Sequence, residues 1–443
     1  GRTLYPSEIA AQLREILPGC RVLRASGGMD EIESEAAALE AAARGMGRNT
    51  PFDSALRAYL RAHSQEDIRR LNLLRGREPE SIRPATARRL YGENLGVSAT
   101  RVETFYKCPF SYFCRYGLKI EPLKPAQMDV LRRGTLIHLA LERILSKHRE
   151  DLAALDAGGL DREIAEILSE YLETVLGGSA DKPRRFLYDL GRIGLMLGEL
   201  LRQLQAEFSQ SGFKPSHFEL GLGDGDGEIG ARPLPLPGGG TITVYGSVDR
   251  GDTWEHEGKT YLRVVDYKSG TRKFRLYDVL YGHNLQMLLY LFALCDEGKG
   301  VLGDELVPAG VLYLPTKRAA ADTAASGEEA DAAALAKKYR MSGLVLGDDD
   351  VIEAMEPGAR GIFIPVSRTK SGALDKRSDT VSASELSLLR RHIARLLTEM
   401  GRRVRAGDAA VAPLDGSKGA CEYCEYLSVC KKEPDAVNPA IPR

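Results

Sequence analysis

The chain has 443 residues, enough for two or three domains, and its formal net charge of −1 neither requires nor excludes a polyanionic partner. It has no apolar run of the ~18 residues that a transmembrane helix needs and no signal-peptide pattern, so we expect neither. The seven cysteines, three of which lie close together near the C-terminus, do not fit a secreted disulfide framework. They indicate a metal site in a reducing compartment, the cytoplasm. Because Gly1 opens the chain in place of Met, we expect a fragment of a longer protein.

The first 95 residues predict a mixed α/β region that ends in helices and carries no catalytic constellation. Residues 21–23 are a short strand candidate, and residues 30–44 combine a polar start with an alanine-rich body, which favours a helix. Residues 55–63 and 64–74 predict two more helices. We interpret residues 1–95 as the end of a larger domain.

A linker over residues 94–100 leads into a helix that ends at Cys108, because Pro109 disfavours the helical conformation in the residue before it. Cys108 and Cys114 are each consistent with a buried, apolar-like thiol or with a metal ligand. The sequence alone leaves both interpretations open for each cysteine.

An amphipathic helix is predicted over residues 128–145, with several apolar side chains and His138 on one face. A histidine in that position is either a hydrogen-bonded core residue or a nitrogen ligand for a nearby metal. Helices over residues 160–176 and 194–210 follow. The strand after them carries Glu219, which either faces solvent or touches the metal site.

Two strands, residues 241–254 and 259–268, are predicted around a two-residue Glu-Gly turn. Counting back from that turn along both strands places Asp249 directly opposite Asp266. Side chains in a strand repeat every second residue, so Lys268 shares a face with Asp266. The hairpin therefore brings two carboxylates and an ammonium group together.

Two opposed carboxylates repel each other unless a cation lies between them, and Mg²⁺ or Mn²⁺ takes such oxygen ligands. With Lys268 placed to hold a phosphate or orient a water molecule, this is the layout of metal-assisted phosphodiester hydrolysis. The alternative interpretation is a solvated hairpin with two surface aspartates and a lysine. A β-bulge would also change the register.

After the hairpin, an apolar helix is predicted over residues 284–293. Its Gln286 and Tyr290 lie one turn apart on one face, which indicates either polar contacts with a substrate backbone or a helix edge. Residues 307–315 and 361–366 predict further strands.

Residues 319–336, rich in Ala, Asp and Glu, predict an inserted, mobile segment. A capping box of Ser382 and Glu385 opens a helix that continues to about residue 405. Four of its arginines form either a DNA-facing stripe or a solvated face: Arg390, Arg391, Arg402 and Arg403.

The C-terminal cysteines have a strong ligand spacing, C-x₂-C followed by x₅-C, at Cys421, Cys424 and Cys430. They supply three of the four thiolates that Zn²⁺ or a [4Fe–4S] cluster needs. The candidates for the fourth are Cys20, Cys114, Cys295 and Cys108. We choose Cys108, because it ends a helix where the catalytic region begins. Such a site would close a long loop and act as a structural staple, and the spacing leaves zinc and iron–sulfur open.

Taken together, these motifs resemble the C-terminal part of the B subunit of AddAB-type (RexAB-type) ATP-dependent helicase–nucleases. The resemblance covers about residue 95 to the end, and the preceding residues are similar, more weakly, to the end of a helicase-like region. It rests on the order of these elements: Cys108-Pro109-Phe110 with Tyr116-Gly117-Leu118, Gly134 to His138, Gly246 to Arg250, Asp266 to Gly270, Gln286 with Tyr290, and the cysteine tail.

This resemblance implies a RecB-like PD-(D/E)XK nuclease, an α/β fold with a central mixed sheet flanked by helices. It implies that Asp249, Asp266 and His138 bind Mg²⁺ (or Mn²⁺) and that Lys268 stabilises the transition state or positions the attacking water. Gln286 and Tyr290 would hold DNA. The four cysteines that would bind a [4Fe–4S] cluster are Cys108, Cys421, Cys424 and Cys430.

Membership of this family further implies processing of DNA double-strand breaks for recombinational repair together with a helicase A subunit. The nuclease, residues 96–443, would be an exonuclease that cuts one unwound single strand, while residues 1–95 would end the helicase-like region. No GxxxxGK[ST] loop for ATP is present. The alternatives are a non-cleaving iron–sulfur DNA-binding module and a stand-alone RecB-like exonuclease of the CRISPR-associated type.

Overall fold

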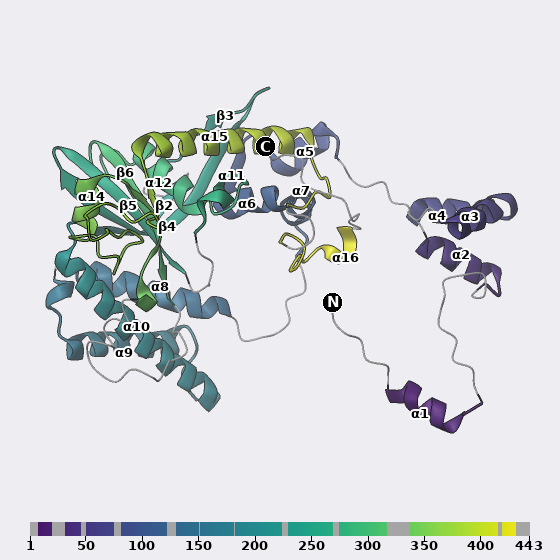
Figure 1. The fold of residues 1–443 in the computed structure, drawn as a ribbon, viewed down its shortest axis with the longest axis horizontal. Coiled ribbons are helices and arrows are strands. Elements are labelled where there is room, and N and C mark those ends of the chain that lie inside the picture. The colour runs from purple at the N-terminus through teal and green to yellow at the C-terminus, as the bar shows by residue number, and fades with distance from the viewer. Residues whose placement is uncertain are drawn as a thin grey trace. The chain divides into compact units, whose positions relative to one another are not determined.

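A computed structural model describes residues 8–19, 32–45, 50–74, 81–121, 130–149, 151–180, 182–223, 229–268, 274–316, 337–414 and 419–430. Figure 1 shows the fold, which divides into two compact units, residues 1–78 and 79–443. Each unit is described by itself. Within the described residues, none of the helices combines the length and the apolar character needed to cross a membrane.

The first unit is helical, with α1 (Glu8–Ile16), α2 (Glu35–Arg44), α3 (Pro51–His63) and α4 (Gln65–Leu74). Its small core contains Ala38, Ala42, Leu56, Leu60 and Leu71. The helix predicted from residue 30 begins at Glu35, because the Ser34 side chain accepts the Ala37 amide and caps it there. The strand candidate at residues 21–23 lies outside the described residues.

The second unit contains a mixed sheet in the order β1-β4-β5-β6-β7-β8, with β2 and β3 also paired to β4. The β1–β4, β5–β6 and β7–β8 pairs are parallel, and the others are antiparallel. The strands are β1 (Leu95–Ser98), β2 (Lys214–Leu222), β3 (Leu234–Pro235), β4 (Thr241–His256), β5 (Lys259–Lys268), β6 (Leu306–Pro315), β7 (Ser342–Leu346) and β8 (Thr380–Val381). The predicted class, α/β with a mixed central sheet flanked by helices, is confirmed.

The β4–β5 hairpin has the predicted turn and register. Glu257 and Gly258 have φ values of 49° and 76°, the left-handed conformation that a type I′ turn requires at both positions. The register runs from His256 opposite Lys259 to Arg250 opposite Val265. Counting one residue beyond that last pair places Asp249 opposite Asp266.

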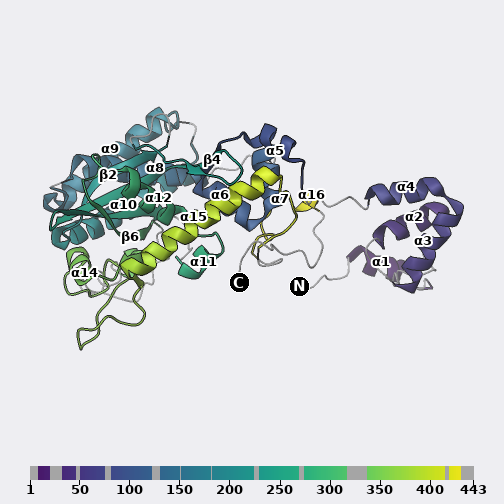
Figure 2. The same cartoon turned by 90° about the horizontal axis from the view of Figure 1, so that it is seen from above.

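Helices cover both sides of the sheet (Figures 1 and 2). The helical elements of this unit are α5 (Pro84–Tyr91), α6 (Ala99–Lys107), α7 (Pro109–Tyr112), the π-helical turn η2 (Phe113–Gly117), α8 (Val130–Lys147), the 3₁₀ turn η3 (Leu152–Ala154), α9 (Ala157–Thr174), α10 (Arg184–Gln210), α11 (Leu276–Leu280), α12 (Gln286–Glu297), α14 (Asp349–Met355), α15 (Ala383–Ala406) and α16 (Leu427–Cys430). β5 is buried along nearly its whole length. It lies between helices, since α12 packs along it and α10 contacts it through Glu207.

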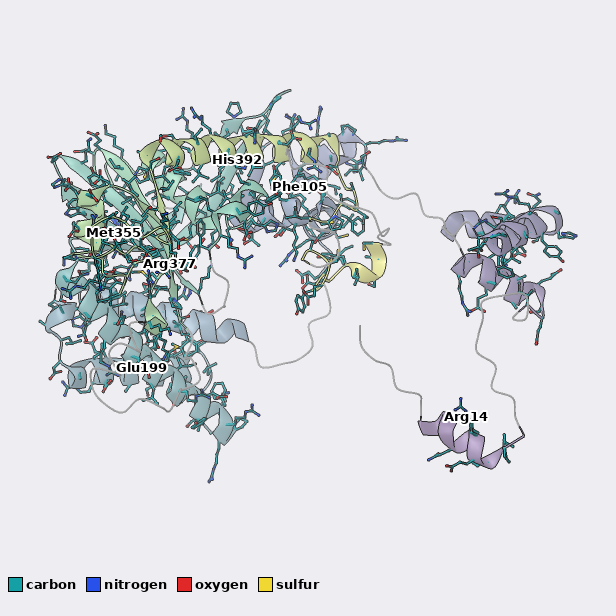
Figure 3. The ribbon with its side chains drawn as sticks, in the orientation of Figure 1. Arg14, Phe105, Glu199, Met355, Arg377 and His392 are labelled. Atoms are coloured by element: carbon teal, nitrogen blue, oxygen red, sulfur yellow. The ribbon has the colours of Figure 1, made fainter. Side chains whose placement is uncertain are left out.

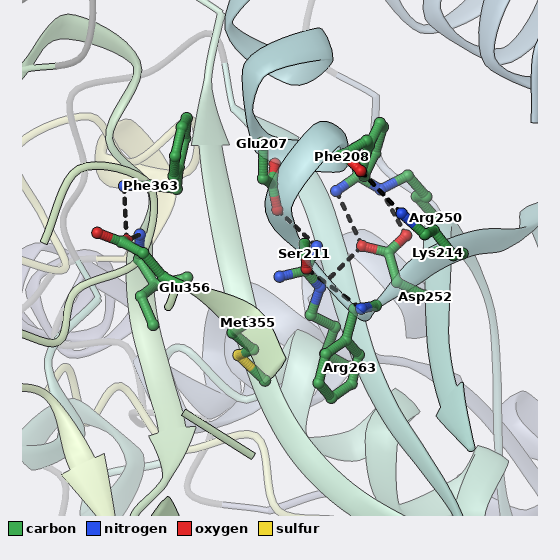
Figure 4. Close-up of polar contacts among 12 residues, drawn as sticks. Glu207, Phe208, Ser211, Lys214, Arg250, Asp252, Arg263, Met355, Glu356 and Phe363 are labelled. Carbon is green, nitrogen blue, oxygen red and sulfur yellow. Dashed lines mark hydrogen bonds and ion pairs between the residues drawn. The ribbon is translucent and has the colours of Figure 1, made fainter. Parts of the chain in front are cut away.

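Two local predictions are wrong. Residues 361–366 do not form a strand, because the buried carboxylate of Glu356 accepts the backbone amides of Ile362, Phe363 and Ile364 (Figure 4). Their amides are therefore unavailable for a sheet. The predicted linker over residues 94–100 contains β1, which pairs in parallel with β4. The segment 319–336 lies outside the described residues.

Candidate active site

Asp249 on β4 is held in place by a hydrogen bond from the adjacent strand, β5. Its Oδ2 accepts the backbone amide of Tyr267 at 2.7 Å, and its side chain is 11% exposed. Tyr267 stands between Asp266 and Lys268 on β5. The hydrogen bond therefore holds one carboxylate against the centre of the Asp-Tyr-Lys segment.

Asp266 and Lys268 form an ion pair, and the side chain of Gln286 lies beside it. Lys268 Nζ lies 2.7 Å from Asp266 Oδ2. Gln286, the first residue of α12, lies close to both, with its Nε2 3.4 Å from Asp266 Oδ1 and its Oε1 3.5 Å from Lys268 Nζ. The amide thus orients the carboxylate and the ammonium group at once.

His138 reaches the same place from α8. Its Nδ1 lies 3.5 Å from Asp249 Oδ1 and 3.7 Å from Glu219 Oε1, and its Nε2 lies 3.3 Å from the carbonyl oxygen of Tyr267. Ligand atoms of His138, Glu219 and Asp249 all lie within 4.8 Å of one another. This is a spacing at which three side chains can share one metal ion.

Glu219, for which the sequence left solvent exposure and contact with the metal site open, lies beside His138 and Asp249. Its φ of 46° lies in the left-handed region, which costs about 1–2 kcal/mol for a residue with a Cβ. Strain of this kind is found preferentially at functional sites. The only sequence signal was the alternation of Glu219 with apolar residues in β2, which fits a solvent-facing position equally well.

The electrostatics of the acids reflect their crowding. Burial, together with the charge of Asp266, raises the pKa of Asp249 to about 7. The hydrogen bond to Glu219 raises the pKa of His138 by more than burial lowers it, and the charge of Asp249 raises this pKa further. Once Asp249 is ionised, three carboxylates therefore surround His138 and Lys268, an excess of negative charge that a bound cation would offset.

Tyr290 packs against β4, the strand that carries Asp249. It is 5% exposed, and its hydroxyl packs so closely on Gly246 of β4 that a Cβ there would lie 2.1 Å from the oxygen. Burial raises the pKa of Tyr290 to about 12, with a further contribution from Asp266. Gln286 is only partly buried and adjoins the acids. Of the two predicted substrate-binding residues, Gln286 is thus the more accessible, and Tyr290 is buried against β4.

A buried ion network lies on the other face of the hairpin (Figure 4). Arg263 donates to Asp252 at 2.9 Å and to Glu207 of α10 at 2.5 Å. Arg250, adjacent to Asp249, pairs with Asp252 at 2.8 Å and lies over the Phe208 ring. Two arginines and two carboxylates balance in charge. The network fixes the strand backbone that carries the acids.

The predicted arginine stripe on α15 is largely paired within the protein. Arg390 pairs with Asp296, Arg402 with Glu399, and the buried Arg403 with Asp408. Arg391 remains exposed. These pairs favour the solvated-face interpretation for most of the helix.

The four predicted cluster cysteines meet in space. Cys108, Cys421, Cys424 and Cys430 line one small pocket, together with apolar residues such as Phe110 and Val411. Burial raises the pKa of the Cys108 thiol. Cys114, the other nearby candidate, is buried beside this pocket and is not part of its lining. Cys295 lies on α12 against the main core, and Cys20 lies outside the described residues.

Comparisons with known proteins agree with the resemblance predicted from the motifs. The family model described as the PD-(D/E)XK nuclease superfamily matches residues 96–431. The chain is 29% identical, over 98% of its length, to the B subunit of an ATP-dependent helicase/deoxyribonuclease from Desulforudis audaxviator, covering 39% of that protein. Proteins of the same name from Clostridium botulinum are 30% identical over 97% of the chain (strain Okra; 40% of that protein) and 32% identical over 78% (strain Loch Maree; 31%).

The first two identities extend over nearly the whole chain and show homology to the helicase/deoxyribonuclease B subunits. The chain spans about two fifths of the length of the curated relatives it matches.

Proposed function

The chain belongs to the PD-(D/E)XK nuclease superfamily, and from this premise we propose that its site hydrolyses phosphodiester bonds of DNA with a divalent cation. The relatives named as deoxyribonuclease subunits support DNA as the substrate. The observation that carries the proposal is the convergence of Asp249, Asp266 and Lys268 at the end of one hairpin, with His138 beside them.

The donor set fits Mg²⁺ or Mn²⁺. Carboxylate oxygens suit both ions, and an imidazole nitrogen favours Mn²⁺ somewhat more. We assign His138, Asp249 and Asp266 as ligands and add Glu219, whose carboxylate adjoins the first two. When bound, the cation supplies positive charge to the scissile phosphate and acidity to the attacking water.

The chain's own residues then have separate roles. Lys268 places an ammonium group where negative charge develops on the phosphate, and Gln286 holds that ammonium group and Asp266 in position. The Tyr267 carbonyl accepts from His138 Nε2–H, which leaves Nδ1 facing the acids as a lone-pair donor. Tyr290 and the buried ion network keep β4 and β5 in register.

At the level of the whole protein, we propose the exonuclease region of a cytoplasmic helicase–nuclease. It would cut one unwound single strand during double-strand break processing, in complex with a helicase A subunit. In this assignment residues 96–443 are the nuclease, and residues 1–95 end a helicase-like region. Homology over nearly the full chain to B subunits named as helicase/deoxyribonucleases supports it.

We also propose that Cys108, Cys421, Cys424 and Cys430 hold a [4Fe–4S] cluster. Four sulfur donors around one small pocket fit the ligand count of such a cluster. Because Cys108 is separated from the tail cysteines by more than three hundred residues of sequence, their ligation would restrict the unfolded chain strongly. The cluster would therefore act as a structural staple and take no part in catalysis.

The proposal is tested by incubating the purified chain with a single-stranded oligonucleotide, with Mg²⁺ or with EDTA. We expect cleavage with Mg²⁺, none with EDTA, and none by Asp249→Asn. Binding of the oligonucleotide without cleavage in Mg²⁺ and Mn²⁺ would instead identify a non-cleaving DNA-binding module.

A further inference from the structure

Helix α11 presents apolar and aromatic side chains to solvent next to the site. Tyr277 is 64% exposed, Leu280 46% and Leu276 40%. The Tyr277 ring lies 4.8 Å from that of Tyr281, and their hydroxyls are hydrogen-bonded. An exposed cluster of this kind marks a binding surface more often than an isolated apolar residue does.

The cluster is held in place by its surroundings. The Asp278 carbonyl accepts the amides of Tyr281 and His283, each at 3.0 Å, while its carboxylate accepts from the Asn284 side chain at 2.8 Å. Gly282, with φ of 77°, packs against Tyr106 so closely that a Cβ would lie 2.4 Å from the ring. Tyr277 and Tyr281 are therefore presented on a fixed turn.

The neighbouring face of α15 is basic. His392 Nε2 lies 3.3 Å from the Leu280 carbonyl, and Arg395 donates to His392 Nδ1 at 3.0 Å. Burial and then Arg395 lower the pKa of His392, so the neutral ring donates to α11 and accepts from Arg395. Figure 3 labels His392 on α15, and Figure 2 shows α11 beside that helix. Arg391 and Arg395, one helical turn apart, are both exposed.

The surface also connects directly to the site. Tyr281 precedes Gln286 by five residues, so their Cα atoms are at most ~18 Å apart. That span corresponds to about five nucleotides at the ~3.4 Å rise of a stacked strand. A strand that reaches Lys268 can therefore reach α11 as well.

We infer that α11 and the adjoining face of α15 bind single-stranded DNA beside the cleavage site, with Tyr277 stacking on a base and Arg391 and Arg395 contacting phosphates. Aromatic rings interleaved with cations are the surface that proteins use for unpaired strands. In a duplex the base faces are already stacked on one another, so they are not available to an aromatic ring such as that of Tyr277. The inference rests on the proposed function in that it takes DNA as the ligand.

The test measures binding separately from cleavage. Fluorescence anisotropy with labelled oligothymidine, in buffer without divalent cations, gives the affinity, and an abasic strand of equal length gives the affinity without stacking. We expect Tyr277→Ala to weaken oligothymidine binding about 5-fold to 150-fold, the range for loss of one stacked base, and to leave abasic binding unchanged. Tyr277→Phe keeps the ring and should bind like wild type.

Substitution of the two arginines should change binding in a different way from substitution of Tyr277. Arg391→Ala with Arg395→Ala should weaken binding of both strands equally and reduce the slope of log affinity against log salt by about 1.4, or ~0.7 per lost phosphate contact. Tyr188→Ala is the matched control, because Tyr188 of α10 is 67% exposed and also lies beside an arginine, Arg192. It should bind like wild type.

Equal binding of oligothymidine by wild type and Tyr277→Ala would overturn the inference and assign the patch to a protein partner. That result is independent of cleavage. If wild type binds as expected but does not cleave in Mg²⁺ or Mn²⁺, the proposed function fails and the binding surface stands.

Discussion

The Tyr267 amide donates to Asp249 Oδ2 across 2.7 Å, which ties the acid on β4 to the middle of the Asp266–Lys268 segment on β5. The Tyr267 carbonyl lies 3.3 Å from His138 Nε2. The backbone of one residue thus orients two of the groups assigned to the cation. The geometry of the site therefore depends on the register of the hairpin.

The metal-free protein should lose stability as pH rises. The pKa of Asp249 is raised to about 7 in the folded protein, so this carboxyl holds its proton in the folded state between about pH 4 and 7 and has lost it in the unfolded state. Stability therefore falls across that window. The raised pKa of His138 acts in the same direction, because the stability it contributes is lost as pH rises through its folded pKa.

Because Mg²⁺ binds the ionised carboxylates, we expect it to raise Tm more at pH 8 than at pH 6. Thermal unfolding with and without Mg²⁺ at the two pH values measures this. In Asp249→Asn the difference should shrink. An equal Mg²⁺ effect at both pH values would contradict the assignment of Asp249 as a ligand.

Glu219 allows metal binding and backbone strain to be separated. Glu219→Ala and Glu219→Gly both remove the carboxylate, so both should weaken Mn²⁺ affinity by about 10–100-fold, as measured by calorimetry. Glycine adopts the positive φ without the Cβ penalty, so Glu219→Gly should be about 1 kcal/mol more stable than Glu219→Ala in urea unfolding. Wild-type Mn²⁺ affinity in both variants would exclude Glu219 from the site.

The buried network predicts non-additive effects on stability. Arg263→Met leaves Glu207 and Asp252 with a buried excess of negative charge and should cost about 3–5 kcal/mol. Adding Glu207→Leu removes that excess, so the double variant should be more stable than Arg263→Met alone. Urea unfolding gives both values.

The exposed Arg377, paired with Asp375, supplies the control for the network. Arg377→Met should change stability by less than about 1 kcal/mol. If Arg263→Met were equally mild, the network would have no part in holding β4 against β5.

The cysteine site can be tested by two matched substitutions. Cys108→Ser should abolish the visible absorbance of an iron–sulfur cluster and the bound iron, whereas Cys114→Ser, at a buried neighbour outside the pocket lining, should retain both. Absorbance spectra and metal analysis of the purified proteins give the answer. Stoichiometric zinc in a colourless wild-type protein would refute the iron–sulfur assignment.

The sequence predicted those parts of the site that are set locally. The turn at Glu257 and Gly258 fixes the pairing of β4 with β5, so the relation of Asp249 to Asp266 follows by counting. Helical spacing likewise placed Gln286 and Tyr290 on one face of α12, although the contacts of Gln286 with Asp266 and Lys268 were not predicted. These relations need no knowledge of the tertiary fold.

The remaining features depend on long-range packing, which spacing does not encode. Whether His138 or Glu219 faces the acids is decided by how α8 and β2 pack on the hairpin. The strand wrongly predicted over residues 361–366 has apolar composition that favours β-structure, but the buried carboxylate of Glu356 takes its amides. Tyr290, for which helical spacing left a substrate contact and a helix edge open, is buried against Gly246.

The central claim is that Asp266 and Lys268 carry out metal-dependent cleavage, and the initial rate on a single-stranded oligonucleotide in Mg²⁺ tests it most directly. Asp266→Ala and Lys268→Ala should each lower the rate by about 10²–10³-fold or more. Lys259→Ala, at the exposed far end of the same strand, should cleave like wild type. Wild-type rates in both Asp266→Ala and Lys268→Ala would contradict the account.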